Sequence, residues 1–161
     1  NIQGDARYVL TPTHVKAEVW MALIHGARGI GYFSHHWNPF SEIGLLETDE
    51  MRLAIAAINA QITALAPVLN TQSVANGVTV TSSVATIPVA TMVKRSGGST
   101  YVFAVGMRPG STEATFTLRA FAGASNVEVV GEGRIVSASG GVFGDTFSSH
   151  AAHIYKIPNP R

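Results

Sequence analysis

The apolar residues change their spacing near Asn70, and this change most constrains what the chain can fold into. Before that point the apolar positions recur at helical spacing, whereas residues 74–157 alternate with a period of two and carry turn signals every eight to twelve residues. We therefore expect two regions joined at 70–73: residues 1–70, a piece of an α/β domain, and residues 71–161, an all-β domain.

Two helices are predicted in the first region. Thr11-Pro12 begins the first one, over 13–25, because threonine caps free amides and proline suits the first helical position; Gly26 ends it. The second covers about 49–66, with Thr48 or Asp49 as its cap and Pro67 as its end. Its apolar stripe consists of Met51, Ile55, Ile58, Ile62 and Leu65.

The short run Gly29–Phe33 lies between these helices and lacks polar alternation, which is typical of a strand buried on both faces in a parallel sheet. It leads into the polar and aromatic segment Ser34-His35-His36-Trp37-Asn38. Loops at the carboxyl ends of parallel strands converge on one crevice, so chemistry is expected there.

The second region predicts seven or eight short strands in an antiparallel sandwich. Candidate turns are rich in glycine, among them Ser96-Gly97-Gly98-Ser99 and Ser139-Gly140-Gly141. Its aromatic residues include Tyr101, Phe103 and Phe116. They occupy alternate strand positions, which are expected to face the core.

Composition narrows the function classes. The net charge is +1 without a basic run, which disfavours nucleic acid as a partner, and the absence of cysteine excludes disulfides, thiolate catalysis and cysteine-bound zinc. No apolar run in the sequence reaches the length of a membrane span, so we expect no membrane partner. No motif in the sequence indicates a bound cofactor. The chain begins at Asn1 without methionine, which suggests a processed product or a fragment.

The stretches MALIHGARGIGYFSHHWNPF and INAQITALAPVLN, followed by the strand-rich half, resemble the C-terminal portion of (β/α)8 glycoside hydrolases of the large retaining clan. The likeness is to bacterial proteins of the β-galactosidase-like or cellulase-like type. It implies the last αβα piece of the barrel followed by a β-sandwich. It also implies that the nucleophile lies just before Asn1 and the acid/base upstream, so both catalytic carboxylates are outside this chain. We further expect a bacterial protein that is secreted or periplasmic.

On this resemblance, Ser34, His35, His36, Trp37 and Asn38 form a sugar subsite, because an aromatic plane can support a pyranose while imidazoles and hydroxyls bind its hydroxyl groups. The plainer interpretation is a polar loop that closes a strand. A metal site at His35 and His36 is disfavoured, because adjacent strand residues point to opposite faces.

Two other functions remain open. One is a Ser/His hydrolase that uses Ser34 or Ser41, with His35 or His36 and Asp5 or Asp49, although no G-x-S-x-G elbow is present. The other is a non-catalytic sandwich module that binds carbohydrate or braces a barrel. The expected partners are carbohydrate and either the missing N-terminal barrel part or further copies of the chain, because a strand with bare edges and apolar faces needs cover.

Overall fold

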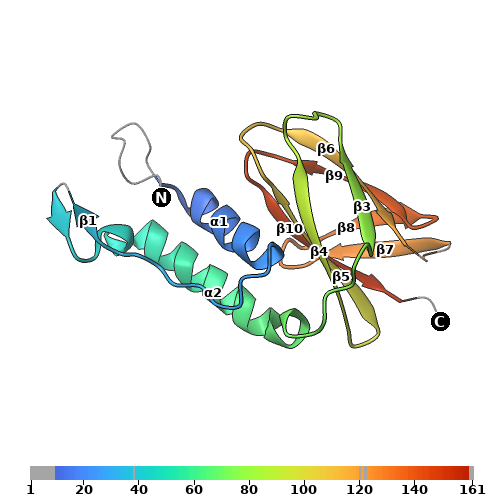
Figure 1. Ribbon diagram of the computed structural model, residues 1–161, viewed down its shortest axis with the longest axis horizontal. Helices are drawn as coiled ribbons and strands as arrows, with labels where there is room; N and C mark the ends of the chain where they lie inside the picture. Colours follow the sequence, from blue (N-terminus) through green and yellow to red (C-terminus); the bar gives the residue numbers. More distant parts are fainter. Residues whose placement is uncertain (1–9, 38, 120, 122, 160–161) are drawn as a thin grey trace.

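The computed structural model describes residues 10–37, 39–119, 121 and 123–159. Figure 1 shows a pair of helices, α1 (Pro12–Ile24) and α2 (Asp49–Leu69), beside a twisted antiparallel sheet that holds most of the C-terminal half. A short hairpin of β1 (His36–Trp37) and β2 (Phe40–Ser41) lies at the far end of α2, away from the sheet, and a 3-10 turn, η1 (Gly44–Leu46), follows it.

Helix α1 begins where its sequence predicts. The Thr11 hydroxyl accepts a hydrogen bond from the His14 amide at 3.3 Å, and Pro12 occupies the first turn. Gly26 adopts a left-handed φ of 100° just after the helix, where a side chain would be strained. The predicted start and end of this helix are confirmed to within a residue.

Helix α2 runs three residues further than predicted. The Thr48 hydroxyl caps it by accepting from the Met51 amide, as expected. Pro67 lies inside the helix, so the prediction that it closes the helix is wrong. A proline lacks a donor and crowds the carbonyl four residues earlier, but the residues after it keep their own amides. The Asn70 amide still bonds the Ala66 carbonyl at 3.0 Å, which completes the last turn.

Helix α2 is long and apolar enough to cross a membrane by length and composition, so the expectation that no apolar run reaches that length is wrong. About a fifth of its most apolar stretch (22%) is buried in the described chain. Its buried residues lie on one stripe that packs against α1 and β4: Met51, Ile55, Ile58, Leu65 and Val68. The predicted amphipathic helix is therefore confirmed, and its other face is unusually poor in charge.

Residues 29–33 do not form the predicted strand. The segment is extended but carries no ladder pairing among the described residues, and its side chains alternate: Ile30 and Tyr32 pack against the helices, whereas Phe33 is exposed. The Tyr32 hydroxyl donates to Asn59 Oδ1 of α2 at 3.0 Å. A parallel-sheet strand requires partners at its edges, and the described part of the chain places none beside this segment. The two predicted helices are present, but the described residues contain no parallel strand, and the barrel piece of the predicted fold is not shown.

The C-terminal half forms one eight-stranded antiparallel sheet in the order β3-β6-β9-β8-β7-β10-β5-β4. The outer strands β3 and β4 approach each other, so the sheet is nearly closed into a sandwich-like shell (Figure 1). The strands are β3 (Val78–Ser82), β4 (Val89–Ser96), β5 (Ser99–Gly106), β6 (Thr112–Leu118), β7 (Ala124–Val129), β8 (Arg134–Ser139), β9 (Val142–Phe147) and β10 (Ala152–Pro158). The predicted antiparallel, sandwich-like character is confirmed.

Two predicted glycine turns set the register of their hairpins. Gly97 and Gly98 join β4 to β5, and Gly140 and Gly141 join β8 to β9. All four have positive φ, from 55° to 77°. Two-residue loops with both φ angles positive match the right-handed twist of paired strands.

Strand β5 separates two apolar cores. Phe103 and Val105 on one face meet the helices, with Trp20 of α1 stacked on Phe103 at a centroid distance of 5.5 Å. Val102 and Ala104 on the other face line the interior of the sheet. Strand β5 is therefore buried on both faces, and the helix pair is packed directly on the sheet.

Candidate functional site

The predicted sugar-subsite residues lie on and before the β1–β2 hairpin. The Ser34 hydroxyl donates to the Glu42 carbonyl at 3.0 Å, and the Leu45 amide donates to the Ser34 carbonyl at 2.9 Å, so Ser34 is bonded to the segment that follows the hairpin. His36 is paired opposite Ser41 in the hairpin. Asn38, which is also predicted to contact sugar, is outside the described residues.

Four rings gather on this loop, and we call Phe33, His35, Trp37 and Phe40 the aromatic cluster. Neighbouring ring centroids are 5.3 to 6.4 Å apart, and the rings of His35 and Trp37 are within 20° of parallel. Trp37 is 69% exposed, Phe40 61% and Phe33 52%. Large apolar side chains that cluster in solvent typically mark a contact surface.

An open groove of about 910 Å³ adjoins the aromatic cluster, since Phe33 lines both. Its walls are mostly apolar and come from α1, from residues 29–33 and from the turn after β5; examples are Val19, Met21, Ile30 and Met107. The groove and the aromatic cluster together form one extended surface that the described chain leaves uncovered.

The loop lacks the contacts of a hydrolytic triad. The Ser34 hydroxyl is engaged by a backbone carbonyl, and Asp49 pairs with Arg52. Among the described residues, neither Ser34 nor Ser41 is hydrogen-bonded to an imidazole, and no group of three or more His, Cys, Asp or Glu side chains is arranged to hold a metal ion. Asp5, the other candidate acid, is outside the described residues. The exposed rings offer flat surfaces and hydrogen-bonding nitrogen atoms, which suit binding better than nucleophilic attack.

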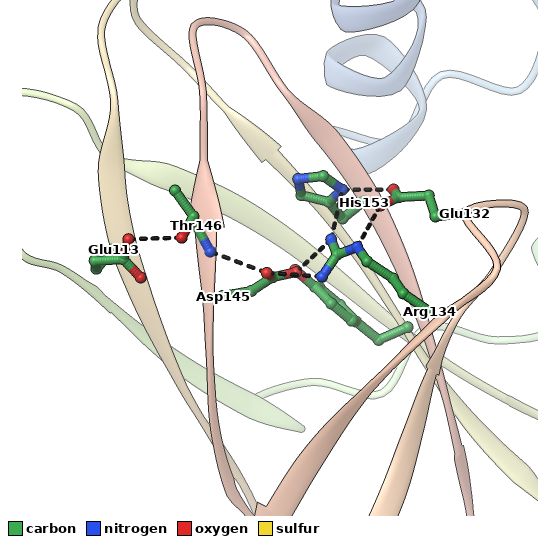
Figure 2. Close-up of polar contacts among 7 residues, drawn as sticks. Glu113, Glu132, Arg134, Asp145, Thr146 and His153 are labelled. Carbon is green, nitrogen blue, oxygen red and sulfur yellow. Dashed lines mark hydrogen bonds and ion pairs between the residues drawn. The ribbon is translucent and has the colours of Figure 1, made fainter.

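The sheet interior contains a polar network that the sequence pattern did not reveal (Figure 2). Arg134 makes a bidentate pair with Asp145, at 2.9 and 2.7 Å, and its Nε donates to Glu132 at 2.8 Å. The other Glu132 oxygen lies 2.5 Å from His153 Nδ1, and the Tyr155 hydroxyl donates to Asp145 at 2.8 Å.

The network faces inward because of strand register. Asp145 is paired with Ala114, His153 with Ala104 and Arg134 with Val129, and each of these partners belongs to the interior core. His153 Nε2 is buried without a hydrogen-bond partner. The network joins β8, β9 and β10, far along the chain from the aromatic cluster. Apart from His153 Nε2, its groups satisfy one another, which indicates a structural role.

The charges of the network follow from these contacts. Burial alone would raise the pKa of Asp145, but the hydrogen bonds from Arg134 and Tyr155 outweigh it and hold that pKa below its ordinary value. Burial likewise opposes ionisation of Glu132, while hydrogen bonds with His153 and Arg134 lower its pKa. Burial, with the neighbouring Asp145 carboxylate, raises the pKa of Tyr155, so its hydroxyl remains a donor.

Acid should therefore weaken the fold through this network. A carboxyl group with a lowered folded-state pKa stabilises the protein above its unfolded pKa of about 4 and loses that contribution as pH falls through the folded value. We expect the free energy of unfolding, measured in urea, to decrease as pH is lowered from about 5 to 3. Asp145→Asn should lower stability at neutral pH and flatten this dependence. If the free energy of unfolding of Asp145→Asn fell with pH as steeply as that of the unmodified chain, the network would not be the source of the pH dependence.

No protein-family model and no curated protein matches this sequence. Solved structures of glycoside hydrolases are similar in fold. Two are AmyP structures, with maltose and with maltotriose, at 11% identity and TM-scores of 0.59 and 0.58; the third is an Anoxybacillus α-amylase at 16% identity and a TM-score of 0.59. The similarity covers 92–93% of this chain but only 33–36% of theirs.

The chain thus spans about a third of the length of these structures and shares its fold with a portion of them. This agrees with the predicted resemblance to a C-terminal portion of a glycoside hydrolase. At 11–16% identity the similarity shows a shared fold alone. It does not assign a role to any residue of the site.

Proposed function

We propose that this chain is the C-terminal part of a glycoside hydrolase that acts on polysaccharide or oligosaccharide. The hairpin loop supplies a sugar subsite, and the sandwich braces the catalytic part, whose carboxylates lie outside the chain. The observation that carries the proposal is the exposed aromatic cluster, in a chain that shares its fold with a portion of glycoside hydrolases.

Within this proposal Trp37 provides the flat face for a pyranose ring, because its indole is the most exposed ring of the cluster. His35, stacked beside it and half-buried, and His36, exposed on the same hairpin, would bind sugar hydroxyls. Ser34 would contribute mainly by closing the loop, since its hydroxyl is already bonded to the Glu42 carbonyl. Asn38 would complete the subsite.

The apolar groove supports the second part of the proposal, a partner that covers it. We favour the preceding part of a longer polypeptide over a second copy, because the similar solved structures are about three times as long as the portion that matches this chain. Such cover would also give residues 29–33 the edge partners that they lack in the described chain.

A sandwich that binds carbohydrate by itself is the weaker alternative. Phe103 and Phe116 are fully buried, and Tyr101 packs against the helix core, so these aromatic residues make no exposed platform. Their burial favours a bracing role for the sandwich.

The subsite predicts a fluorescence response. Addition of maltotriose, cellotriose or lactose at millimolar concentration to the chain should shift the emission of exposed Trp37 to shorter wavelength for at least one sugar, because stacking removes water from the indole. Trp37→Ala is the matched control: it retains buried Trp20 and should show no response. If none of these sugars changes the emission of the unmodified chain, the subsite assignment fails.

A further inference from the structure

His14 and His150 meet at the boundary between the helix pair and the sandwich. His14 lies in the first turn of α1, and His150 lies in the turn between β9 and β10. Their ring centroids are 5.2 Å apart with the planes at 73°, an edge-to-face contact. Both rings line the groove that adjoins the aromatic cluster.

His14 is held in a form that leaves one ring nitrogen without a proton. The Thr11 backbone amide donates to His14 Nδ1 at 3.3 Å, and the Thr11 hydroxyl lies 3.0 Å from the same nitrogen. An amide can only donate, so Nδ1 must accept and the neutral ring carries its proton on Nε2. A second proton on His14 would remove this acceptor from the start of α1.

His150 is held in place by its surroundings. Its φ is 57°, a left-handed value that is uncommon for non-glycine residues, although histidine adopts it more often than most. Its Nδ1 lies 3.1 Å from the Ser149 hydroxyl. The contact with His14 therefore joins two locally fixed rings.

Among the residues that the structure describes, the other ionisable groups that line this groove are Glu18 of α1, Arg108 after β5 and Tyr32 of the extended segment. One carboxylate and one guanidinium offset each other. With both imidazoles charged, three cations would share a single carboxylate, and two like charges about 5 Å apart repel. Histidine is the side chain that ordinarily changes charge between pH 5 and 8.

We propose that the His14–His150 contact is an acid-sensitive joint: it holds the start of α1 against the sandwich while at least one ring is neutral and releases it when both rings are protonated. Release also removes the capping acceptor from Thr11, so the first turn of α1 loosens and the groove widens beside the aromatic cluster. The joint rests on this contact alone and is independent of the proposed function.

Hydrogen–deuterium exchange of the full chain, compared at pH 7.5 and pH 5.0 after correction for intrinsic exchange, tests the joint. We expect protection of the α1 amides to fall about tenfold at pH 5.0, while the amides of β6 and β9 keep theirs. His150→Asn tolerates a left-handed φ and cannot gain a proton, so the pH effect on α1 should be abolished beyond the first turn, where a proton on His14 still removes the acceptor for the Thr11 amide.

If His150→Asn fails to fold, a second variant can test the same proposal. His14→Asn presents an oxygen that can accept from the Thr11 amide and should likewise abolish the pH effect. The proposal is overturned if α1 protection in the unmodified chain does not change with pH, if both variants keep the full change, or if β6 and β9 lose protection to the same extent as α1.

Discussion

Trp20→Ala is expected to destabilise the chain by about 3–5 kcal/mol, because it removes the largest fully buried side chain. Trp20 is only 1% exposed and stacks on Phe103, so truncation would leave a cavity between α1 and β5 that packed strands cannot readily fill. Urea unfolding followed by circular dichroism measures the loss as a lower midpoint at unchanged slope.

Trp37→Ala is the matched control for this substitution. It removes the same side chain from a position that is 69% exposed, and its effect should stay within about 0.5 kcal/mol. Similar losses for both variants would show that the helix pair is not packed on the sheet through Trp20.

Asp145→Ala is expected to cost about 3 kcal/mol at pH 7. The substitution leaves Arg134 without its bidentate partner and leaves the hydroxyl of fully buried Tyr155 without an acceptor. A buried polar group that loses its partner destabilises the folded state by its full desolvation penalty. Removal of this one carboxylate is therefore expected to have a large effect on stability. Thermal or urea unfolding provides the measurement.

The exposed ion pair between Glu128 and Lys156 supplies the comparison for Asp145. Its charged atoms are 3.8 Å apart and both side chains are more than 40% exposed, so Glu128→Ala should change stability by less than about 1 kcal/mol. A loss for Asp145→Ala no greater than that for Glu128→Ala would mean that the network does not stabilise the sheet.

Local signals in the sequence predict much of the fold. Thr11, Thr48 and Gly26 mark helix ends, and paired glycines mark hairpins, because each satisfies a requirement of the backbone at that residue. The strand prediction for Gly29–Phe33 is wrong because an apolar stretch does not specify its partners: a strand exists only where another strand pairs with it. The prediction for Pro67 is wrong because a proline in the final turn removes a single hydrogen bond.

The candidate site is predictable in part. The sequence predicts that the 34–38 loop carries binding residues, but its pattern does not include Phe33 or Phe40. Phe33 lies two residues before His35 on the same extended segment, whereas Phe40 joins the cluster only after the chain turns at the hairpin. The inward network is not predictable, because its members come from separate strands and meet through register. Alternation in β9 and β10 places Asp145 and His153 on the core-facing side, which is the one available signal.

Hydrolysis of aryl glycosides is the most direct test of the proposed function. It should be measured for the 161-residue chain alone and for any longer polypeptide that its gene encodes. The proposed function predicts no turnover above background for the chain alone, because retaining hydrolysis requires two carboxylates about 5 Å apart and the chain is proposed to lack them. It predicts turnover by a longer polypeptide, reduced about tenfold by Trp37→Ala, which corresponds to roughly 1.4 kcal/mol of transition-state binding. Turnover by the chain alone that disappears in His35→Ala, or a gene that encodes no catalytic domain before Asn1, would contradict it.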